Sequence, residues 1–134
     1  IFFTVAAIAK EKMDVALLPA SLAGGLIAYL FFNFHPAKVF MGDTGSMFLG
    51  GAVVALSYGI NCPIILLLIG IVYLCEAFSV ILQVAYFKKT QKRLFKMSPI
   101  HHHFEMCGMN EKQIVLMFSL AATVLCLISY YMFF

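Results

Sequence analysis

Three consecutive histidines are the residues in this sequence best suited to chemistry. His101, His102 and His103 lie between Pro99 and Glu105, in a segment that separates two long apolar runs. Adjacent histidines point about 100° apart on a helix and alternate faces on a strand, so they are poorly arranged to chelate one zinc ion. Their rings suit hydrogen bonding to a nucleotide diphosphate, or proton transfer near neutral pH. A solvated surface cluster is the simpler alternative.

A second polar segment, residues 33–46, ends in the run Gly42-Asp43-Thr44-Gly45-Ser46 and leads directly into an apolar stretch. Asp43 suits the N-cap of a helix there, where its carboxylate would accept a backbone N–H. A carboxylate beside two glycines and a helix N-terminus also suits a Mg²⁺ ion whose other ligands are water and substrate phosphate oxygens. Both interpretations stay open on the residues alone.

Two polar side chains interrupt the apolar run that follows Pro63. Glu76 lies near its middle, where a carboxylate is costly in lipid and usually faces a protein interior or an aqueous groove. A protonated or hydrogen-bonded packing role is the alternative. Gln83, nearer the end of the run, is expected either to point into the same site or to bond a neighbouring helix. Gly70 would let this helix bend.

The composition places these residues in a membrane protein. The chain has 134 residues, of which 63% are hydrophobic and only 11% charged, and its mean hydropathy is +1.00. Soluble domains are about 25% charged, so there are too few charges here to cover a globule of this size. The four cysteines show no C-x-x-C spacing. We therefore expect free cysteines rather than disulfides or a zinc knuckle.

The apolar runs predict an all-α fold, a polytopic transmembrane helix bundle, because they are continuous rather than alternating as barrel strands are. Four full spans are predicted, at 15–32, 45–60, 63–87 and 113–134. The opening run, 1–9, is too short to cross a bilayer, which needs about 20 residues. We expect the chain to begin inside a fifth span, and residues 1–134 to be the C-terminal part of a single integral-membrane domain.

Basic residues set the expected orientation. Seven Lys and Arg residues fall in the loops 33–44 and 88–112, and only Lys10 and Lys12 lie on the opposite side. The positive-inside rule then puts the two loops in the cytoplasm. No nucleic-acid partner is implied, because the basic cluster lies beside a span, where anionic lipid headgroups attract it.

The two polar segments resemble a known family. The Phe-Met-Gly-Asp-Thr-Gly-Ser run of residues 40–46 and the Pro-Ile-His-His-His-Phe-Glu run of 99–105 are similar to those of the bacterial phospho-N-acetylmuramoyl-pentapeptide transferases. The first run is shared across the wider polyprenyl-phosphate N-acetylhexosamine-1-phosphate transferase superfamily, and the triple histidine narrows the choice. The resemblance covers essentially the whole chain, as the last four to five of the family's ten helices.

The resemblance implies a Mg²⁺-dependent enzyme of peptidoglycan synthesis in the bacterial inner (cytoplasmic) membrane, with its active site facing the cytoplasm. Phospho-MurNAc-pentapeptide would pass from UDP-MurNAc-pentapeptide to undecaprenyl phosphate, giving lipid I and UMP. Besides the lipid bilayer, the partners implied are the N-terminal half of the same protein and a possible homodimer. The family's earlier acidic loops are absent from these residues, so we expect the chain alone to be inactive.

The resemblance also assigns roles to single residues. The catalytic set consists of Asp43, His101, His102 and His103. Asp43 matches the carboxylate of the metal site. For substrate binding, Phe40 stands where the family places an aromatic ring against the uracil, Asn33 where it places a polar contact to the nucleoside, and Gln83 matches a polar contact late in the ninth helix.

Three competing functions are kept. The first is a transferase that moves GlcNAc-1-phosphate from UDP-GlcNAc to a polyprenyl phosphate, against which the segment 99–105 argues. The second is a membrane metal transporter, which would carry acidic and histidine residues inside several spans, whereas only Glu76 qualifies. The third is a structural half-protein that completes the fold of another chain, which is compatible with the enzyme.

Overall fold

The computed structural model describes residues 1–34 and 36–134, and His35, in the predicted loop 33–44, lies outside the described residues. The described residues form seven α-helices and no strand, which confirms the all-α prediction. They divide into two compact units. The first holds Ile1–Leu66 together with Tyr130–Phe134, and the second holds Leu67–Ser129.

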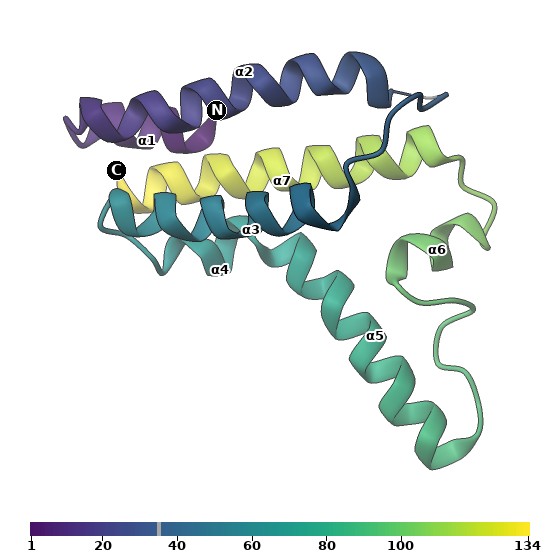
Figure 1. The fold of residues 1–134 in the computed structure, drawn as a ribbon. Coiled ribbons are helices and arrows are strands. Elements are labelled where there is room, and N and C mark those ends of the chain that lie inside the picture. The colour runs from purple at the N-terminus through teal and green to yellow at the C-terminus, as the bar shows by residue number, and fades with distance from the viewer. Residues whose placement is uncertain (35) are drawn as a thin grey trace. The chain divides into compact units, whose positions relative to one another are not determined.

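The first unit is built on an antiparallel helix pair. Helix α1 (Phe2–Ala9) folds back along the first part of α2 (Met13–Asn33), and α3 (Gly42–Gly59) follows after a loop (Figure 1). Ala6 and Ala7 are fully buried on α1. Their small side chains let the two backbones approach closely, which is how helices pack in lipid, where a hydrophobic driving force between helices is absent.

A lysine connects two turns of the first unit. Lys12, just before α2, donates from Nζ to the carbonyl oxygen of Gly59 at 2.8 Å. The same ammonium donates to the side-chain oxygen of Asn61 at 2.9 Å, in the amide orientation that also lets the Asn61 nitrogen donate to the Tyr58 carbonyl oxygen. A Cβ on Gly59 would lie 3.0 Å from Val15 Cγ1. The end of α3 therefore sits close against the start of α2, and Lys12 satisfies the Gly59 carbonyl, which the helix end leaves free.

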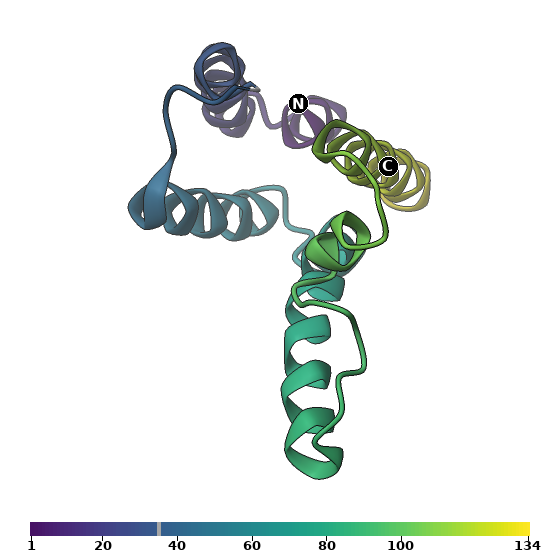
Figure 2. The same ribbon diagram turned by 90° about the vertical axis from the view of Figure 1, so that its right-hand side faces the viewer.

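The second unit is organised around α5 (Ile71–Thr90). After α5 the chain runs back beside it to the short helix α6 (Ile100–Glu105), and then enters α7 (Glu111–Phe133) (Figure 2). The Gln113 side chain starts α7 by accepting the Asn110 backbone N–H at 3.0 Å, as in a capping box. The fold thus carries the histidine segment back onto the helix that holds Glu76.

Three of the helices, α2, α5 and α7, are long and apolar enough to cross a membrane. The sequence predicted four complete spans, and the difference lies in α3. That helix has 18 residues and opens with Gly42-Asp43-Thr44-Gly45-Ser46, which lower its mean hydropathy. The predicted span at 45–60 stays a prediction.

The predicted span 63–87 is divided in the structure. A short helix, α4 (Ile65–Ile69), ends just before Gly70, and α5 begins just after it and continues to Thr90. Glycine is costly inside a helix, which explains the break at this position. The predicted loop 88–112 likewise contains the last turn of α5, all of α6 and the start of α7.

Replacing Lys12 with Met should destabilise the complete protein by about 1 kcal/mol, the typical worth of a lost intramolecular hydrogen bond, because Gly59 and Asn61 both lose their donor. Thermal unfolding in detergent measures the effect. Lys38→Met is the matched control, since its exposed side chain makes no hydrogen bond to any described residue. Equal midpoints for the two variants would show that Lys12 contributes nothing.

Candidate functional site

The histidine segment forms a helix of its own because of the residues that flank it. Pro99 precedes α6 and its carbonyl oxygen accepts the His102 N–H at 3.1 Å. At the other end Gly108 adopts a φ of +98°, a conformation that L side chains rarely adopt. This lets the Met109 N–H reach back to the carbonyl oxygen of Phe104 at 3.2 Å. The three histidines are therefore fixed on a single, capped turn of helix.

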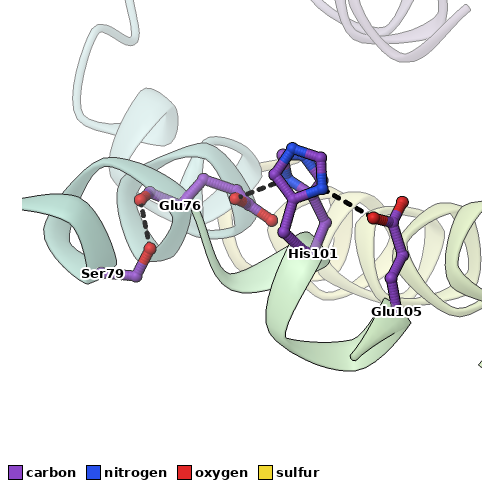
Figure 3. A network of polar contacts seen from close by, with 5 residues as sticks. Glu76, Ser79, His101 and Glu105 are labelled. Carbon is purple, nitrogen blue, oxygen red and sulfur yellow. Dashed lines mark hydrogen bonds and ion pairs between the residues drawn. The ribbon is translucent and has the colours of Figure 1, made fainter. Parts of the chain in front are cut away.

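Each of the three histidines has a partner for its Nδ1 atom. His101 Nδ1 lies 3.0 Å from Glu76 Oε2 on α5, and His102 Nδ1 lies 2.6 Å from Glu105 Oε2 within α6. His103 Nδ1 accepts the Lys96 backbone N–H at 3.2 Å. Figure 3 shows the carboxylate of Glu76 directed at the His101 ring. All three rings are thus held at one edge by the protein itself.

These partners divide the histidines into two kinds. A carboxylate only accepts hydrogen bonds, so a neutral His101 or His102 carries its proton on Nδ1 and presents an Nε2 lone pair. A backbone N–H only donates, so a neutral His103 carries its proton on Nε2, which lies 3.8 Å from Cys107 Sγ. The first two rings are equipped to accept a proton or a hydrogen bond at Nε2, and the third to donate one.

Glu76 is the unusual member of this group because it lies within an apolar helix. Its side chain is 21% exposed, against 38% for His101, and its Oε1 atom is buried with no hydrogen-bond partner among the described residues. An unpaired buried carboxylate is expensive. The bond from His101 is the one that offsets this cost, and it fixes α6 to α5.

An open cavity of about 540 Å³ lies beside this pair. Glu76, His101 and Glu105 contribute its polar wall, and apolar residues of α5 and α7 such as Val72 and Phe118 contribute the rest. The cavity belongs entirely to the second unit. A ligand here would meet carboxylate-backed imidazoles on one side and an apolar surface on the other.

Gln83 has a role that the sequence did not predict. Its Oε1 accepts the backbone N–H groups of Phe95 at 2.8 Å and Leu94 at 3.2 Å, and its Nε2 donates to the Phe95 carbonyl oxygen at 3.3 Å. Both ends of the amide are therefore bonded to the segment that leads to α6. Gln83 holds this segment along α5, and its predicted contact to substrate stays a prediction.

Asp43 lies in the first unit, in the first turn of α3, and its side chain is exposed. It is not the N-cap, because Met41 occupies that position and no side chain caps the helix. Gly42 has a φ of +65°, and a Cβ on Gly45 would collide with the side chain of Met41. The two glycines thus permit a tight entry to the helix, which leaves the Asp43 carboxylate facing outward.

That position fits the chemistry of a magnesium ligand. Mg²⁺ is usually held by one or two carboxylates and keeps several waters or substrate oxygens. Among the described residues, none donates a hydrogen bond to the Asp43 carboxylate, and no three His, Cys, Asp or Glu residues cluster in a way that would hold an ion. The described residues therefore offer one carboxylate at this position.

Asn33 and Phe40 flank the loop before α3. The Asn33 side chain donates from Nδ2 to the Val39 carbonyl oxygen at 2.9 Å, and the Lys38 N–H donates to the Phe32 carbonyl oxygen at 2.8 Å, so the loop closes on itself. Phe40 is 80% exposed. A large exposed aromatic ring at the mouth of a polar loop is available to stack on a planar ligand.

Comparison with known proteins identifies the family. The model of glycosyl transferase family 4 matches residues 1–61, which include Asn33, Phe40 and Asp43. A protein named phospho-N-acetylmuramoyl-pentapeptide-transferase in Clostridium perfringens (strain 13 / Type A) is 54% identical over 118 residues, which are 88% of this chain and 37% of that protein. The chain belongs to the phospho-N-acetylmuramoyl-pentapeptide-transferase family.

Two further members of this transferase family extend the match. The protein of the same name in Clostridioides difficile (strain 630) is 51% identical over 128 residues, and that in Clostridium novyi (strain NT) is 49% identical over 129 residues. Each alignment covers 96% of this chain and 40% of the relative. The chain thus spans well under half the length of the curated transferases that it matches.

The alignments with the named transferases cover both polar segments. The family model ends at residue 61, before the histidines, so the likeness of α6 rests on the longer alignments with the named transferases. Two hydrogen-bond partners of the histidines, Glu105 and the Lys96 N–H, were not predicted from the sequence. Glu105 could have been recognised as a partner of His102, because it lies three residues later on the same helix and side chains at this spacing are neighbours. The Lys96 N–H could not, because it belongs to an irregular segment.

Replacing Glu76 with Leu should reduce the population of the Nδ1–H tautomer of His101, because the acceptor that stabilises this tautomer is lost. Side-chain ¹⁵N chemical shifts of the complete, histidine-labelled protein report the tautomer directly. Glu105→Leu is the matched control, since it should change His102 and leave His101 as it was. If both variants altered the two histidines alike, the separate pairing would be wrong.

Gln83→Ala should release residues 94 and 95, because their two N–H groups lose the Gln83 acceptor. Hydrogen exchange of the complete protein should show faster exchange at these amides, as expected when local opening costs less free energy. Amides in the middle of α7 should be unaffected and serve as the internal reference. Unchanged protection at 94 and 95 would contradict the assigned role.

Proposed function

We propose that the complete protein transfers phospho-MurNAc-pentapeptide from UDP-MurNAc-pentapeptide to undecaprenyl phosphate, giving lipid I and UMP. The observation that carries the proposal is the 54% identity to a protein named phospho-N-acetylmuramoyl-pentapeptide-transferase, over 88% of this chain. The carboxylate-backed histidines and the outward-facing Asp43 support it, because the reaction needs groups of both kinds. Catalysis is assigned to the complete protein, of which this chain supplies one portion.

In this reaction an oxygen of undecaprenyl phosphate forms a bond to the sugar-linked phosphorus of the UDP-sugar. The bond from that phosphorus to the oxygen shared with UMP breaks, and UMP leaves with the electron pair. Both substrates are anionic, so their repulsion must be offset before they meet. A bound magnesium ion would supply that positive charge.

The residues of this chain have distinct tasks in the proposed mechanism. Asp43 would contribute one carboxylate oxygen to the metal, with Phe40 stacked on the uracil and Asn33 near the nucleoside. The Nε2 atoms of His101 and His102 would accept a proton or hydrogen bond from the phosphate monoester of undecaprenyl phosphate, since their Nδ1 atoms are engaged by carboxylates. His103 would donate from Nε2.

We further propose that the protein lies in the bacterial cytoplasmic membrane, with residues 33–44 and the histidine helix on the cytoplasmic side. The support is the basic bias of these segments together with three helices of crossing length. The two segments share one side when both α3 and α5 cross, so this placement includes the predicted span at 45–60. The cytoplasmic side is where a soluble nucleotide substrate is found. The lipid acceptor would approach from within the bilayer.

A substrate exchange tests the proposed function. The complete, purified protein is incubated with Mg²⁺, undecaprenyl phosphate and either UDP-MurNAc-pentapeptide or UDP-GlcNAc, and the lipid product is identified by mass spectrometry. The proposal expects lipid I from the first donor and no product from the second. Product from UDP-GlcNAc alone would establish the alternative transferase, and product from neither would contradict both.

Asp43→Asn in the complete protein should lower turnover by more than about a hundredfold. Replacing a residue that only hydrogen-bonds a metal ligand already costs about 10–100-fold in metal affinity or activity, and Asp43 is proposed as a ligand itself. Initial rates of lipid I formation at saturating Mg²⁺ measure this. Asp14→Asn is the control, since Asp14 is also exposed in the first turn of an α-helix, and it should retain the original rate. Near-normal turnover in Asp43→Asn would remove the metal assignment.

A further inference from the structure

A second cavity in the second unit is lined by positive charge. It has a volume of about 610 Å³ and lies where α5 ends and the chain turns back. Three cations, Lys88, Arg93 and Lys96, line it together with the apolar side chains of Val84, Phe87 and Met97. We call this cavity the basic pocket.

The charges of the basic pocket have no anionic partner nearby. The sequence contains no Asp or Glu between Glu76 and Glu105. Among the described residues, no carboxylate lies within salt-bridge distance of a pocket cation. Arg93 Nη1 donates only to the Lys96 carbonyl oxygen at 3.5 Å, and Lys96 Nζ to the Met106 carbonyl oxygen at 3.2 Å. Three cations converge on one cavity, and their charge is not neutralised by the chain.

The pocket is also held in shape. Gln83, which forms part of its wall, bonds the backbone of residues 94 and 95 through both ends of its amide. Arg93 and Lys96 belong to the segment so fixed. The converging cations are therefore carried by an anchored segment of chain, and their arrangement does not depend on lysines that happen to meet at a surface.

The location suits a molecule with an anionic head and an apolar body. Lys88 lies in the last turn of α5, a helix long and apolar enough to cross a membrane. Val84 and Phe87 precede it on the same helix, on the side of the membrane interior. Cations beside an apolar wall at the end of a crossing helix match the headgroup region of a lipid.

We propose that the basic pocket binds the headgroup phosphate of an anionic membrane phospholipid, with the acyl chains along Val84 and Phe87. This inference rests on the membrane placement of α5 and not on the transfer reaction. Two other cations of the same stretch, Lys89 and Lys92, do not line the pocket. Replacing these two lysines therefore distinguishes lipid binding in a defined pocket from diffuse attraction of the basic segment to a negatively charged membrane surface.

The test compares two double variants of the complete protein that each remove two charges from the same stretch. Lys88→Gln with Arg93→Gln empties the pocket of two cations, and Lys89→Gln with Lys92→Gln is the matched control. Native mass spectrometry in detergent counts bound phosphatidylglycerol over a titration, with phosphatidylcholine as the zwitterionic reference. We expect the pocket variant to bind phosphatidylglycerol more than tenfold more weakly, at about fivefold per cation, and the control to change by less than about threefold.

Equal losses in the two double variants would overturn the proposal in favour of diffuse attraction, and no loss in either would overturn it outright. Undecaprenyl phosphate and inorganic phosphate are added as competitors. Displacement of phosphatidylglycerol by undecaprenyl phosphate at equal concentration would assign the pocket to the acceptor lipid instead. Displacement by inorganic phosphate alone at millimolar concentration would make it a general phosphate site.

Turnover of the same variants, measured without phosphatidylglycerol, keeps the two proposals distinguishable. The pocket variant should form lipid I at the original rate, because neither Lys88 nor Arg93 is assigned to the reaction. A protein that makes no lipid I but shows the predicted lipid preference would contradict only the proposed function. A fully active protein whose variants bind phosphatidylglycerol alike would contradict only the basic pocket.

Discussion

The hydrogen bond between Glu76 and His101 is the contact on which the second unit depends. Glu76 lies within a helix that is otherwise apolar and of membrane-crossing length. A carboxylate in that position must find a partner, because its desolvation otherwise costs several kcal/mol. His101 is 25 residues further along the chain, so satisfying Glu76 requires the chain to fold back. The return of α6 to α5 meets this requirement, and Gln83 holds the connecting segment along α5.

The same bond determines what the histidine helix can do. Because Glu76 accepts a hydrogen bond from the Nδ1–H of His101, the Nε2 lone pair is left available, and Glu105 has the same effect on His102. His103 receives a backbone donor and ends in the opposite state. Three identical residues in a row therefore present two acceptors and one donor. The donor can bond a phosphate oxygen, and the two acceptors can take a proton from the phosphate monoester of the lipid acceptor, as the proposed transfer requires.

Much of this was predictable from sequence, for physical reasons that differ between elements. The length of the apolar runs predicted the helices, since only helices satisfy their own backbone in lipid, and Glu76 was recognised because a carboxylate is rare there. The pairing of Glu76 with His101 was not predictable, because two residues that are 25 positions apart share no helical or strand spacing that would indicate a contact. The bonds from Gln83 to the backbone of residues 94 and 95 were not predictable either, because that segment is irregular, and the substrate contact of Gln83 stays a prediction. Asp43 was considered for the N-cap, but the tight entry at Gly42 moves that position to Met41.

The most direct test of this account is a double-mutant cycle on turnover of the complete protein, with Glu76→Gln, His101→Ala and the two combined. If Glu76 acts by fixing the His101 ring, its replacement should cost activity only while the histidine is present. The account predicts that the double variant forms lipid I no more slowly than His101→Ala alone. Multiplicative losses would contradict it, because they would show that the two residues act independently.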